Sequence, residues 1–312
     1  MQTPDRRNGG ARMEKKDVYL YGMILMTTSH LLRDDYPEAD QYSEIKQSFR
    51  FPGGETGCCA NVLSSLRLTV RMDGNYQGRN TYQPLVDFFE KTRVDMSRLV
   101  NSPEFDGVED LVIIDTNTRT CFGRFVEYFS RPKKLWSMPQ REDIEAADTV
   151  GLDPFFGEAS EEVAKIAHEL NKPYVTIDCK YDSLLHNLSS VNVISNEFIR
   201  GNYAGEDIDE LFERYTANSD GLVIFTFGSK KIIYGRKGGP IQIFIPFSVQ
   251  VVSTLGAGDT FKAGAIYALH QKMNDLDLVR FAAATAGIAC ESYPIAYNPP
   301  TLEKIEELLT RA

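Results

Sequence analysis

The sequence predicts an α/β fold with a mainly parallel central β-sheet. In the second half of the chain, short apolar runs rich in β-branched residues alternate with amphipathic helical patterns, as they do in βαβ units. Two glycine-rich turns, "GGETG" at 53–57 and "LGAGD" at 255–259, each lead from an extended segment into a helical pattern. The length of 312 residues suffices for one large domain of this class or for two small ones.

The first half of the chain is the less regular one. Residues 17–27 predict one buried strand, and the polar, acidic stretch behind them predicts a loop or an edge hairpin. The glycine-rich turn at the start of 51–68 leads into one helix, and 84–100 predict a second. Residues 111–129 are rich in β-branched and aromatic residues, so we expect a strand pair or a strand with a wide turn at Asn117.

The second half supplies the regular alternation. Strands are predicted within 147–156, 173–180, 190–197 and 221–231, and helices over 158–172, 207–217 and 260–271. Ligands of such sheets bind beyond the carboxyl ends of the strands. We therefore expect the turns that follow the strands to face one crevice, at 153–157, 178–182, 195–200, 226–229 and 253–259.

Composition excludes several classes of protein. Lys and Arg total 34 against 44 Asp and Glu, a formal charge of -10, and no dense basic stripe indicates a nucleic-acid partner. No apolar run approaches the roughly 20 residues that cross a bilayer, so no membrane partner is expected. The five cysteines lack CxxC spacing, which indicates neither a disulfide framework nor a zinc site. We expect a cytoplasmic protein with a flexible extension over 1–17 and a folded domain over 18–312.

The stretch "STLGAGDTF" at 253–261 carries the chemistry of greatest interest. Gly256, Ala257 and Gly258 leave the backbone open to close approach by a ligand. The helix that follows presents unpaired amides and the positive end of its dipole, which suit a phosphate group. Asp259 at this point either caps the helix or has a chemical role beside a bound anion.

This stretch resembles the DTxGAGD signature of the ribokinase-like (PfkB) carbohydrate kinases, and "GGETGCCANVL" at 53–63 resembles the N-terminal glycine motif of that family. Supporting matches occur in family order at "GLDPFF", "TIDCK", "VISNE" and "IFTFGSKK". The resemblance implies a three-layer ribokinase-like sandwich, with a small β-strand lid over about 31–52 and 108–132. It also implies ATP-dependent phosphorylation of a hydroxyl of a sugar or sugar-like molecule.

The resemblance assigns roles to particular residues. Asp259 would be the catalytic base, and the amides of Gly256, Ala257 and Gly258 would form the anion hole. ATP would be the phosphoryl donor with Mg²⁺ as its metal. The remaining matched positions are Gly57 and Asn61 for the acceptor, with Gly54 as second choice, Thr226, Gly228 and Asn196 for the nucleotide, and Glu197 for the metal.

Simpler interpretations stay open beside these roles. Asn61 can be a helix-capping residue, and Gly53 with Gly54 can form a tight turn and nothing more. The resemblance implies that the adenine lies between the "TFGSKK" turn and the helix around 283–287, but residues 281–289, "FAAATAGIA", can equally be a small-residue helix packed close to the sheet. Lys262 can approach a nucleotide phosphate, but an exposed helix charge is the more common case and is what we expect.

The sequence departs from the family pattern at three positions. Ser253 replaces the Asp that holds the activating monovalent cation in ribokinase, so potassium activation is in doubt. Ile199 stands where the NxxE motif has its Glu, and Glu197 could substitute only in a different register. Thr27 stands where an Asp usually grips sugar hydroxyls. These departures favour the alternative of a binding or regulatory protein with weakened catalysis; a nucleoside or vitamin-precursor kinase is a further alternative.

The lid segments carry two more expectations. Arg119 and Arg124 can cover the acceptor or can be solvated hairpin charges. Family members often dimerise through lid strands, so the resemblance also implies a homodimer with the aromatic-rich segment 121–129 as its surface. An ordinary buried strand face explains that segment equally well.

Overall fold

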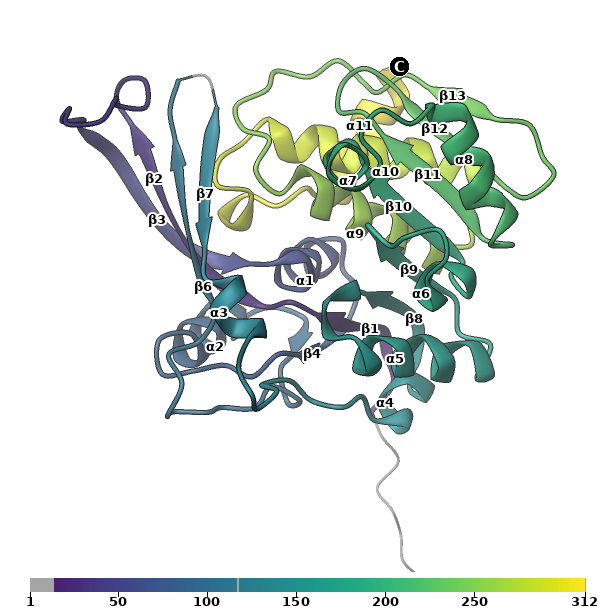
Figure 1. Ribbon diagram of the computed structural model, residues 1–312, viewed down its shortest axis with the longest axis horizontal. Coiled ribbons are helices and arrows are strands. Elements are labelled where there is room, and N and C mark those ends of the chain that lie inside the picture. The colour runs from purple at the N-terminus through teal and green to yellow at the C-terminus, as the bar shows by residue number, and fades with distance from the viewer. Residues whose placement is uncertain (1–13, 117, 312) are drawn as a thin grey trace, which may run out of the picture.

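The computed structural model describes residues 14–116 and 118–311, which contain two β-sheets (Figure 1). The strands of the larger sheet, from one edge to the other, are β13 (Gln242–Phe244), β12 (Ile232–Gly235), β11 (Leu222–Thr226), β10 (Val191–Ser195), β9 (Tyr174–Ile177), β8 (Ala147–Leu152), β1 (Lys16–Gly22), β4 (Val70–Gly74) and β5 (Val94–Asp95). The strands from β11 to β5 run parallel, and β12 and β13 continue antiparallel at one edge. The predicted α/β fold is confirmed.

A smaller sheet projects from the side of the larger one, at the left of Figure 1, and forms the lid. Its order is β3 (Ile45–Gly53), β2 (Leu25–Leu32), β6 (Glu109–Ile114) and β7 (Arg119–Gly123). The lid therefore begins at Leu25, earlier in the chain than the expected segment 31–52. The turn expected at Asn117 lies outside the described residues.

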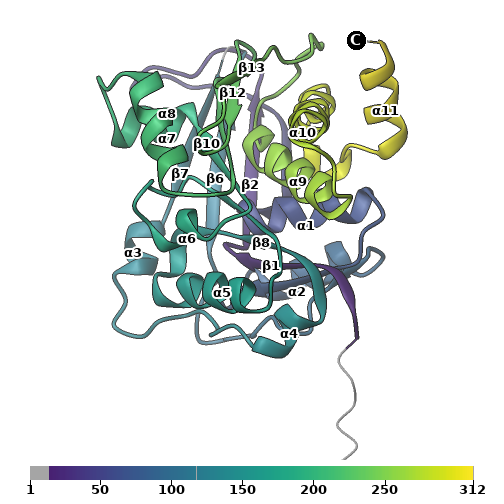
Figure 2. The same cartoon turned by 90° about the vertical axis from the view of Figure 1, so that its right-hand side faces the viewer.

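Helices cover both faces of the main sheet, so the molecule has three layers (Figure 2). One face carries α1 (Glu55–Ser65), α2 (Tyr82–Phe89), α9 (Ala257–His270), α10 (Asp275–Cys290) and α11 (Leu302–Arg311). The other carries α4 (Arg141–Glu145), α5 (Glu158–Glu169), α6 (Leu184–Asn187), α7 (Asn196–Asn202) and α8 (Ile208–Ala217). The short elements are α3 (Phe125–Phe129), η1 (Pro154–Phe156) and η2 (Ile295–Tyr297). Alternate strand residues feed the two cores, since Val18 and Leu20 point to one and Tyr19 and Tyr21 to the other.

Small residues bring α9 and α10 close together. A Cβ atom added at Gly264 would lie 2.8 Å from the Cα of Ala282, so a larger residue there would push the helices apart. Ala282 and Ala284 are fully buried in the same core. The small-residue stretch of α10 therefore allows close packing, but against α9 and not against the sheet as expected.

The single strand predicted over 17–27 is wrong, because the chain passes there from one sheet to the other. β1 ends at Gly22 and β2 begins at Leu25. Asp153 Oδ2 accepts from the amide of Met23 at 2.9 Å, and Asn75 bonds both the amide and the carbonyl of Ile24, at 2.7 and 2.8 Å. The apolar run is continuous because both sheets bury it, and these polar contacts mark the crossing.

Three other boundaries differ from the sequence prediction. The helix expected over 84–100 is only α2, which ends at Phe89 so that the chain can add β5 to the edge of the sheet. The last residues of 111–129 form α3 instead of continuing the strand pair. The antiparallel strands β12 and β13 were not predicted, because the polar turn "RKGG" between them separates two short runs.

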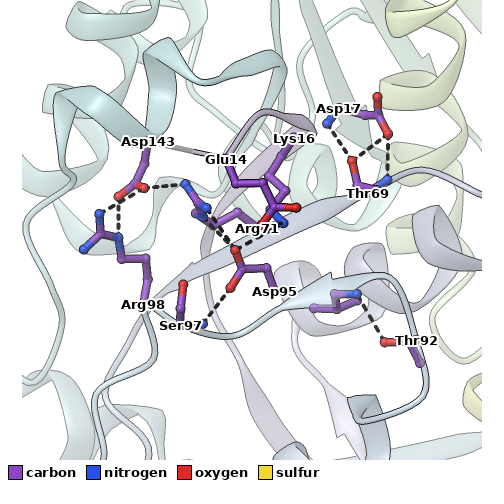
Figure 3. Close-up of polar contacts among 11 residues, drawn as sticks. Glu14, Lys16, Asp17, Thr69, Arg71, Thr92, Asp95, Ser97, Arg98 and Asp143 are labelled. Carbon is purple, nitrogen blue, oxygen red and sulfur yellow. Dashed lines mark hydrogen bonds and ion pairs between the residues drawn. The ribbon is translucent and has the colours of Figure 1, made fainter. Parts of the chain in front are cut away.

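A buried ion-pair cluster lies at the amino-terminal ends of the strands of the main sheet (Figure 3). We call this end of the sheet its amino edge, and the opposite end, where the parallel strands terminate, its carboxyl edge. Arg71 on β4 pairs with Asp95 on β5 at 2.9 Å and with Asp143 on α4 at 2.7 Å. Arg98 approaches Asp143 at 2.6 Å, and Lys16 approaches Asp95 at 3.5 Å. Burial opposes ionisation of Asp95, but hydrogen bonds from Ser97 and Arg71 outweigh it and lower the pKa of Asp95 to about 2. We call these residues the amino-edge cluster.

No helix within the described residues has the length and apolar character that crossing a membrane requires. The five cysteines lie in the described part of the chain and are all free thiols.

Candidate active site

A pocket of about 210 Å³ lies between the lid and the first turn of α9. The lid contributes its inner face, the turn between β3 and α1 contributes glycines, and the segment that includes η2 closes the remaining side. The lining residues are Leu25, Thr27, Phe51, Pro52, Gly53, Gly54, Glu55, Cys58, Asn61, Asp110, Val112, Cys121, Phe125, Leu255, Gly256, Asp259, Tyr293, Ile295 and Ala296.

Asp259 reaches this pocket because the chain turns sharply at Gly256. Gly256 has a φ of 78°, in the left-handed region that favours glycine, and it is the N-cap residue of α9. The amide and hydroxyl of Thr260 donate to its carbonyl at 2.9 and 2.8 Å. Since Gly256 occupies the cap position, the interpretation of Asp259 as the helix cap is wrong. The carboxyl group lies in the first helical turn, beside the pocket.

The amides predicted as an anion hole belong to the same turn. Ala257 donates to the carbonyl of Thr254 at 3.2 Å, whereas the amides of Gly256 and Gly258 have no hydrogen-bond acceptor among the described residues. The first amides of any helix lack partners within it and carry the positive end of the helix dipole. The turn therefore offers donors to an anion that enters the pocket.

A buried ion pair supports this turn from behind. Lys262 and Asp153 pair directly, and both side chains are almost completely shielded from solvent. Lys262 also donates to the carbonyl of Leu152 at 3.2 Å. Burial alone lowers the pKa of Lys262, but Asp153 raises it above its usual value. The expectation that Lys262 is an exposed helix charge is wrong, because α9 turns this position toward the carboxyl end of β8.

Asp259 is half-buried in a region of negative potential. Burial and the nearby carboxylate of Asp153 raise the pKa of Asp259 to about 7, against the lowering effect of Lys262. Glu55, which also lines the pocket, has its pKa raised by burial and by Asp259. A carboxyl group with a pKa near neutrality can take or release a proton under physiological conditions.

The glycine motif places its residues unequally. Gly53 and Gly54 line the pocket, and Gly54 has a φ of 74° that brings its backbone against Met23. Gly57 lies inside α1, where it packs against Ile24 and Pro52 and does not line the pocket. Asn61 lines the pocket and donates from Nδ2 to the carbonyl of Ala296 at 2.9 Å, so it is not a helix cap.

The residues matched to a nucleotide site follow adjacent strands of the main sheet. Thr226 ends β11 and Asn196 begins α7, directly after β10. Gly228 is exposed, with a φ of 60° and open space around its Cα. These positions lie at the carboxyl edge of the sheet, the edge where Asp153 and Asp178 follow β8 and β9. They do not line the pocket of Asp259.

No group of three or more His, Cys, Asp or Glu side chains in the described ranges could hold a metal ion by itself. The crevice nevertheless carries surplus negative charge, because Asp153 and Asp178 raise the pKa of Asp259 while Lys262 and Arg119 lower it less. Mg²⁺ commonly binds through one or two carboxylates together with substrate phosphates. This arrangement fits an ion that arrives with a nucleotide.

The structure places Glu197, the residue expected to bind the metal, on α7. Glu197 is exposed on the first turn of α7, and its charge contributes to the raised pKa of Asp178. Ile199 is 3% exposed and packs in the core formed with Tyr203 and Leu211. Position 199 therefore points away from the crevice.

Sequence reasoning missed two acidic residues of the pocket, Glu55 and Asp110. Glu55 follows the recognised glycines directly and was within reach of the same motif. Asp110 lies on β6 opposite Thr27 of β2, and only the strand pairing reveals this proximity. No local pattern in the sequence distinguishes Asp110 from the other acidic residues near it.

Hydrogen bonds join the lid to the body around the pocket. Arg119 of β7 donates to Thr254 Oγ1 at 2.5 Å, and the hydroxyl of Tyr297 donates to the carbonyl of Arg50 at 2.7 Å. Ser29 and Tyr293 share a further hydroxyl contact. Arg119 is exposed and does not line the pocket, but its bond to Thr254 ties the end of the lid to the segment before α9.

Comparison with known proteins gives a consistent result. The family profile described as pfkB family carbohydrate kinase matches residues 15–302. The chain is 33% identical over 90 residues to a ribokinase of Haemophilus influenzae, covering 29% of each protein. It is 21% identical over 178 residues to a 5-dehydro-2-deoxygluconokinase of Halalkalibacterium halodurans, covering 57% of this chain and 50% of that protein. These alignments span half or less of the relatives' own length.

Solved structures share the fold over nearly the whole chain. A putative ribokinase from Agrobacterium tumefaciens superposes with a TM-score of 0.82 at 19% identity, covering 95% of this chain and 98% of that one. The ribokinase of Arabidopsis thaliana complexed with ribose and ATP gives a TM-score of 0.77 at 16% identity, covering 95% and 99%. The fold is therefore the ribokinase-like one.

Proposed function

The chain belongs to the pfkB family of carbohydrate kinases, and from this premise we propose that it phosphorylates a hydroxyl group of a sugar or sugar-like small molecule with ATP. The observation that carries the proposal is the position of Asp259. It lies in the first turn of α9, and it lines a pocket of about 210 Å³ that can hold a small acceptor. Its pKa of about 7 suits a base that works near neutral pH.

In the proposed reaction, the acceptor hydroxyl oxygen bonds to the γ-phosphorus of ATP as the bond from that phosphorus to the β-phosphate oxygen breaks. Asp259 accepts the hydroxyl proton, and ADP carries the electron pair of the broken bond. The amides of Gly256 and Gly258, which have no acceptor among the described residues, donate to the transferring phosphoryl group, and the amide of Ala257 joins them by giving up its 3.2 Å bond to Thr254. The helix dipole of α9 adds to this stabilisation.

Nucleotide and metal would lie on the side of the crevice formed by α7 and the turn after β11. Thr226, Gly228 and Asn196 are the proposed nucleotide contacts, and Glu197 is the proposed carboxylate for Mg²⁺. When bound with ATP, Mg²⁺ supplies charge neutralisation for the phosphates. The surplus of carboxylates around Asp259 supports a requirement for such a cation.

On the acceptor side, we place Asn61 and Gly54 in contact with the substrate. Both line the pocket, and only glycine fits at position 54, because a Cβ there would lie 2.5 Å from the carbonyl oxygen of Met23. Gly57 remains matched by motif, but its position inside α1 gives it a packing role. A nucleoside or vitamin-precursor alcohol stays an alternative acceptor, since apolar side chains form much of the wall.

The test of the base is the Asp259→Asn variant. We expect turnover with ATP, Mg²⁺ and an acceptor to fall by roughly 10²–10⁴-fold, while nucleotide-induced thermal stabilisation is retained. In the unmodified protein, kcat/KM should rise with pH through about 7, as the base loses its proton. Asp209→Asn, at an exposed Asp in the first turn of α8, is the matched control. Unchanged turnover in Asp259→Asn would rule out its role as base.

The second candidate function is a binding or regulatory protein with weakened catalysis. The observation that favours it is Ile199, which is buried in the core at the position where the family motif has a Glu. Thermal-shift screening against sugars and nucleotides, followed by an ADP-release assay, separates the two. Stabilisation by both ligands without ADP release would favour the binding protein.

We also propose that two copies associate through the lid. The outer lid and α3 expose Phe122 at 46% and Val126 at 84%, and Phe125 and Phe129 are partly exposed beside them. Exposed apolar side chains of this size favour burial in an interface. Sedimentation analysis of the protein and of a Val126→Glu variant tests this association, with a monomer in both contradicting it.

A further inference from the structure

Asp110 is a partly buried carboxylate in the pocket, and the reaction proposed above does not use it. It lies on β6, paired in register with Thr27 of β2, and both side chains line the pocket. Its Oδ1 atom is buried and has no hydrogen-bond partner among the described residues. Burial raises the pKa of Asp110 to about 6, against the lowering effect of the Thr27 hydroxyl.

Such a group lowers the stability of the folded chain. A buried acceptor without a donor has lost its hydration and gained nothing in return, and a carboxylate loses more than a neutral group. At neutral pH Asp110 is ionised, so the penalty applies to a full charge. A hydrogen-bond donor on a ligand in the pocket would remove this penalty. The free energy of ligand binding would therefore depend on the hydrogen bond to Asp110.

The rest of the pocket decides which donors are suitable. Glu55, Asp110 and Asp259 all line it, and no Lys, Arg or His is among the lining residues that the structure describes. An anionic ligand group next to Asp110 would be repelled by its charge, whereas the free amides at the start of α9 serve the transferring phosphoryl group. Much of the remaining wall is apolar and suits the C–H faces of a ring, for example at Leu25, Phe51, Val112, Tyr293 and Ile295.

We propose that Asp110 binds the acceptor directly, by accepting hydrogen bonds from hydroxyls other than the one that is phosphorylated, and that it selects uncharged polyhydroxy alcohols over sugar acids. The proposal rests on the proposed function, since it concerns the acceptor of that same site. Asp110 is a specificity-determining residue here, and Asp259 keeps the role of base.

The neighbouring residue offers a matched control. Glu109 precedes Asp110 on β6, does not line the pocket, and pairs with Arg50 at 2.9 Å. The variants are therefore Asp110→Asn and Glu109→Gln, each of which removes one charge from the same strand. The acceptor panel consists of D-ribose, D-fructose and inosine as uncharged alcohols, with D-ribonate and D-gluconate as acids.

Two measurements are made on each variant: acceptor binding by calorimetry without ATP, and steady-state ADP release with ATP and Mg²⁺. We expect at least one uncharged alcohol to bind the unmodified protein, and the acids to bind at least roughly tenfold more weakly. In Asp110→Asn the acceptor KM should rise by roughly tenfold or more, with kcat and the KM for ATP within about threefold. Glu109→Gln should match the unmodified protein.

Thermal unfolding separates binding from a structural role. If Asp110 only supported the fold, its replacement would lower the unfolding temperature; we expect the Asp110→Asn variant to unfold at the same or a higher temperature. Acceptor binding that is unchanged in this variant, acids that bind as well as alcohols, or no binding by any uncharged alcohol would each overturn the proposal. Binding that depends on Asp110 without ADP release would uphold it and refute the kinase reaction instead.

Discussion

The two edges of the main sheet both bury charged side chains, but they balance the charge differently. In the amino-edge cluster, Asp95 and Asp143 each lie against Arg71 and a second cation (Figure 3). At the carboxyl edge, Lys262 pairs with Asp153, while Asp259 remains nearby with a raised pKa. At the amino edge, cations of the chain itself pair with the buried carboxylates. At the carboxyl edge, Asp259 has no such partner within the described part of the chain.

This difference indicates that the charges at the amino edge serve the stability of the fold, and those at the carboxyl edge serve function. A buried ion pair contributes little net stability, but removing one partner is costly because it leaves the other charge unpaired. The amino-edge cluster therefore holds the edge strand β5 and the helix α4 in place. The carboxyl edge keeps unbalanced carboxylates that a bound cation and substrate would complete. Perturbed carboxyl groups of this kind are common at functional sites.

The largest expected effect comes from breaking the pair that underlies the carboxyl edge. Lys262→Met leaves Asp153 buried without its cation, so the free energy of unfolding should fall by about 3–5 kcal/mol. Turnover should fall as well, since the pKa of Asp259 would rise further without Lys262. Urea unfolding measures the first effect, with Lys165→Met at a half-exposed position of α5 as control. A loss equal to that of the control would contradict the assigned pair.

Breaking the amino-edge cluster should have a smaller effect, on stability alone. In Arg71→Met, Asp143 keeps Arg98 and Asp95 keeps Lys16, so we expect a loss of about 2 kcal/mol in place of the full cost of an unpaired charge. Because the cluster is at the opposite edge from the pocket, kcat/KM should stay within about twofold. Urea unfolding and steady-state kinetics of one preparation test both statements. A large loss of turnover would show that the two edges are coupled.

The two edges should also respond to pH in opposite ways. The lowered pKa of Asp95 gives stability that is complete above its usual value of 3.8 and lost as pH falls through about 2. The raised pKa of Asp259 makes ionisation costly, so its contribution worsens as pH rises from 3.8 through about 7. Relative to the unmodified protein, Asp259→Asn should thus gain stability over that upper range. Asp95→Asn should lose stability at every pH above 4. Parallel pH series of urea unfolding would reveal a wrong sign in either.

The smallest expected effect concerns a monovalent cation. Ser253 accepts from the amide of Leu255 at 3.2 Å, and it brings a hydroxyl where a cation-binding carboxylate would otherwise stand. At constant ionic strength, exchanging Na⁺ for K⁺ should change turnover by less than about twofold. Strong potassium activation would show that backbone oxygens hold the ion without this side chain. The Ser253→Asp variant then asks whether a carboxylate restores the dependence.

Local patterns in the sequence were sufficient for much of the fold. The strands from β8 to β11 are short buried runs, and the helices between them have clear amphipathic spacing, so their order could be predicted without distant contacts. The turn at Gly256 is also local, because a glycine with positive φ and a helix start occupy adjacent residues. The local pattern left Asp259 as either a helix cap or a residue beside a bound anion; the resemblance to the family chose the role of base, which stays a prediction.

The missed features depend on residues that are far apart in the chain. Lys262 is one turn into a helix, where a lysine is usually exposed, and its partner Asp153 is 109 residues away. Asp110 could be placed in the pocket only once the pairing of β6 with β2 put it opposite Thr27. The passage from β1 to β2 lies within one apolar run of the sequence. Two consecutive strands buried in different sheets give the same apolar pattern as one long buried strand.

The residues between β1 and β2 have a mechanical consequence. Met23 is held at its amide by Asp153 and at its carbonyl by the amide of Thr56, at 2.9 and 3.1 Å, while Asn75 grips both backbone groups of Ile24. The lid is thus clamped at its base like a cantilever beam. If the lid opened, the strands would have to bend beyond Leu25 and the bond from Arg119 to Thr254 would have to break, so the displacement would be largest near Arg119 and smallest near Thr27 and Asp110.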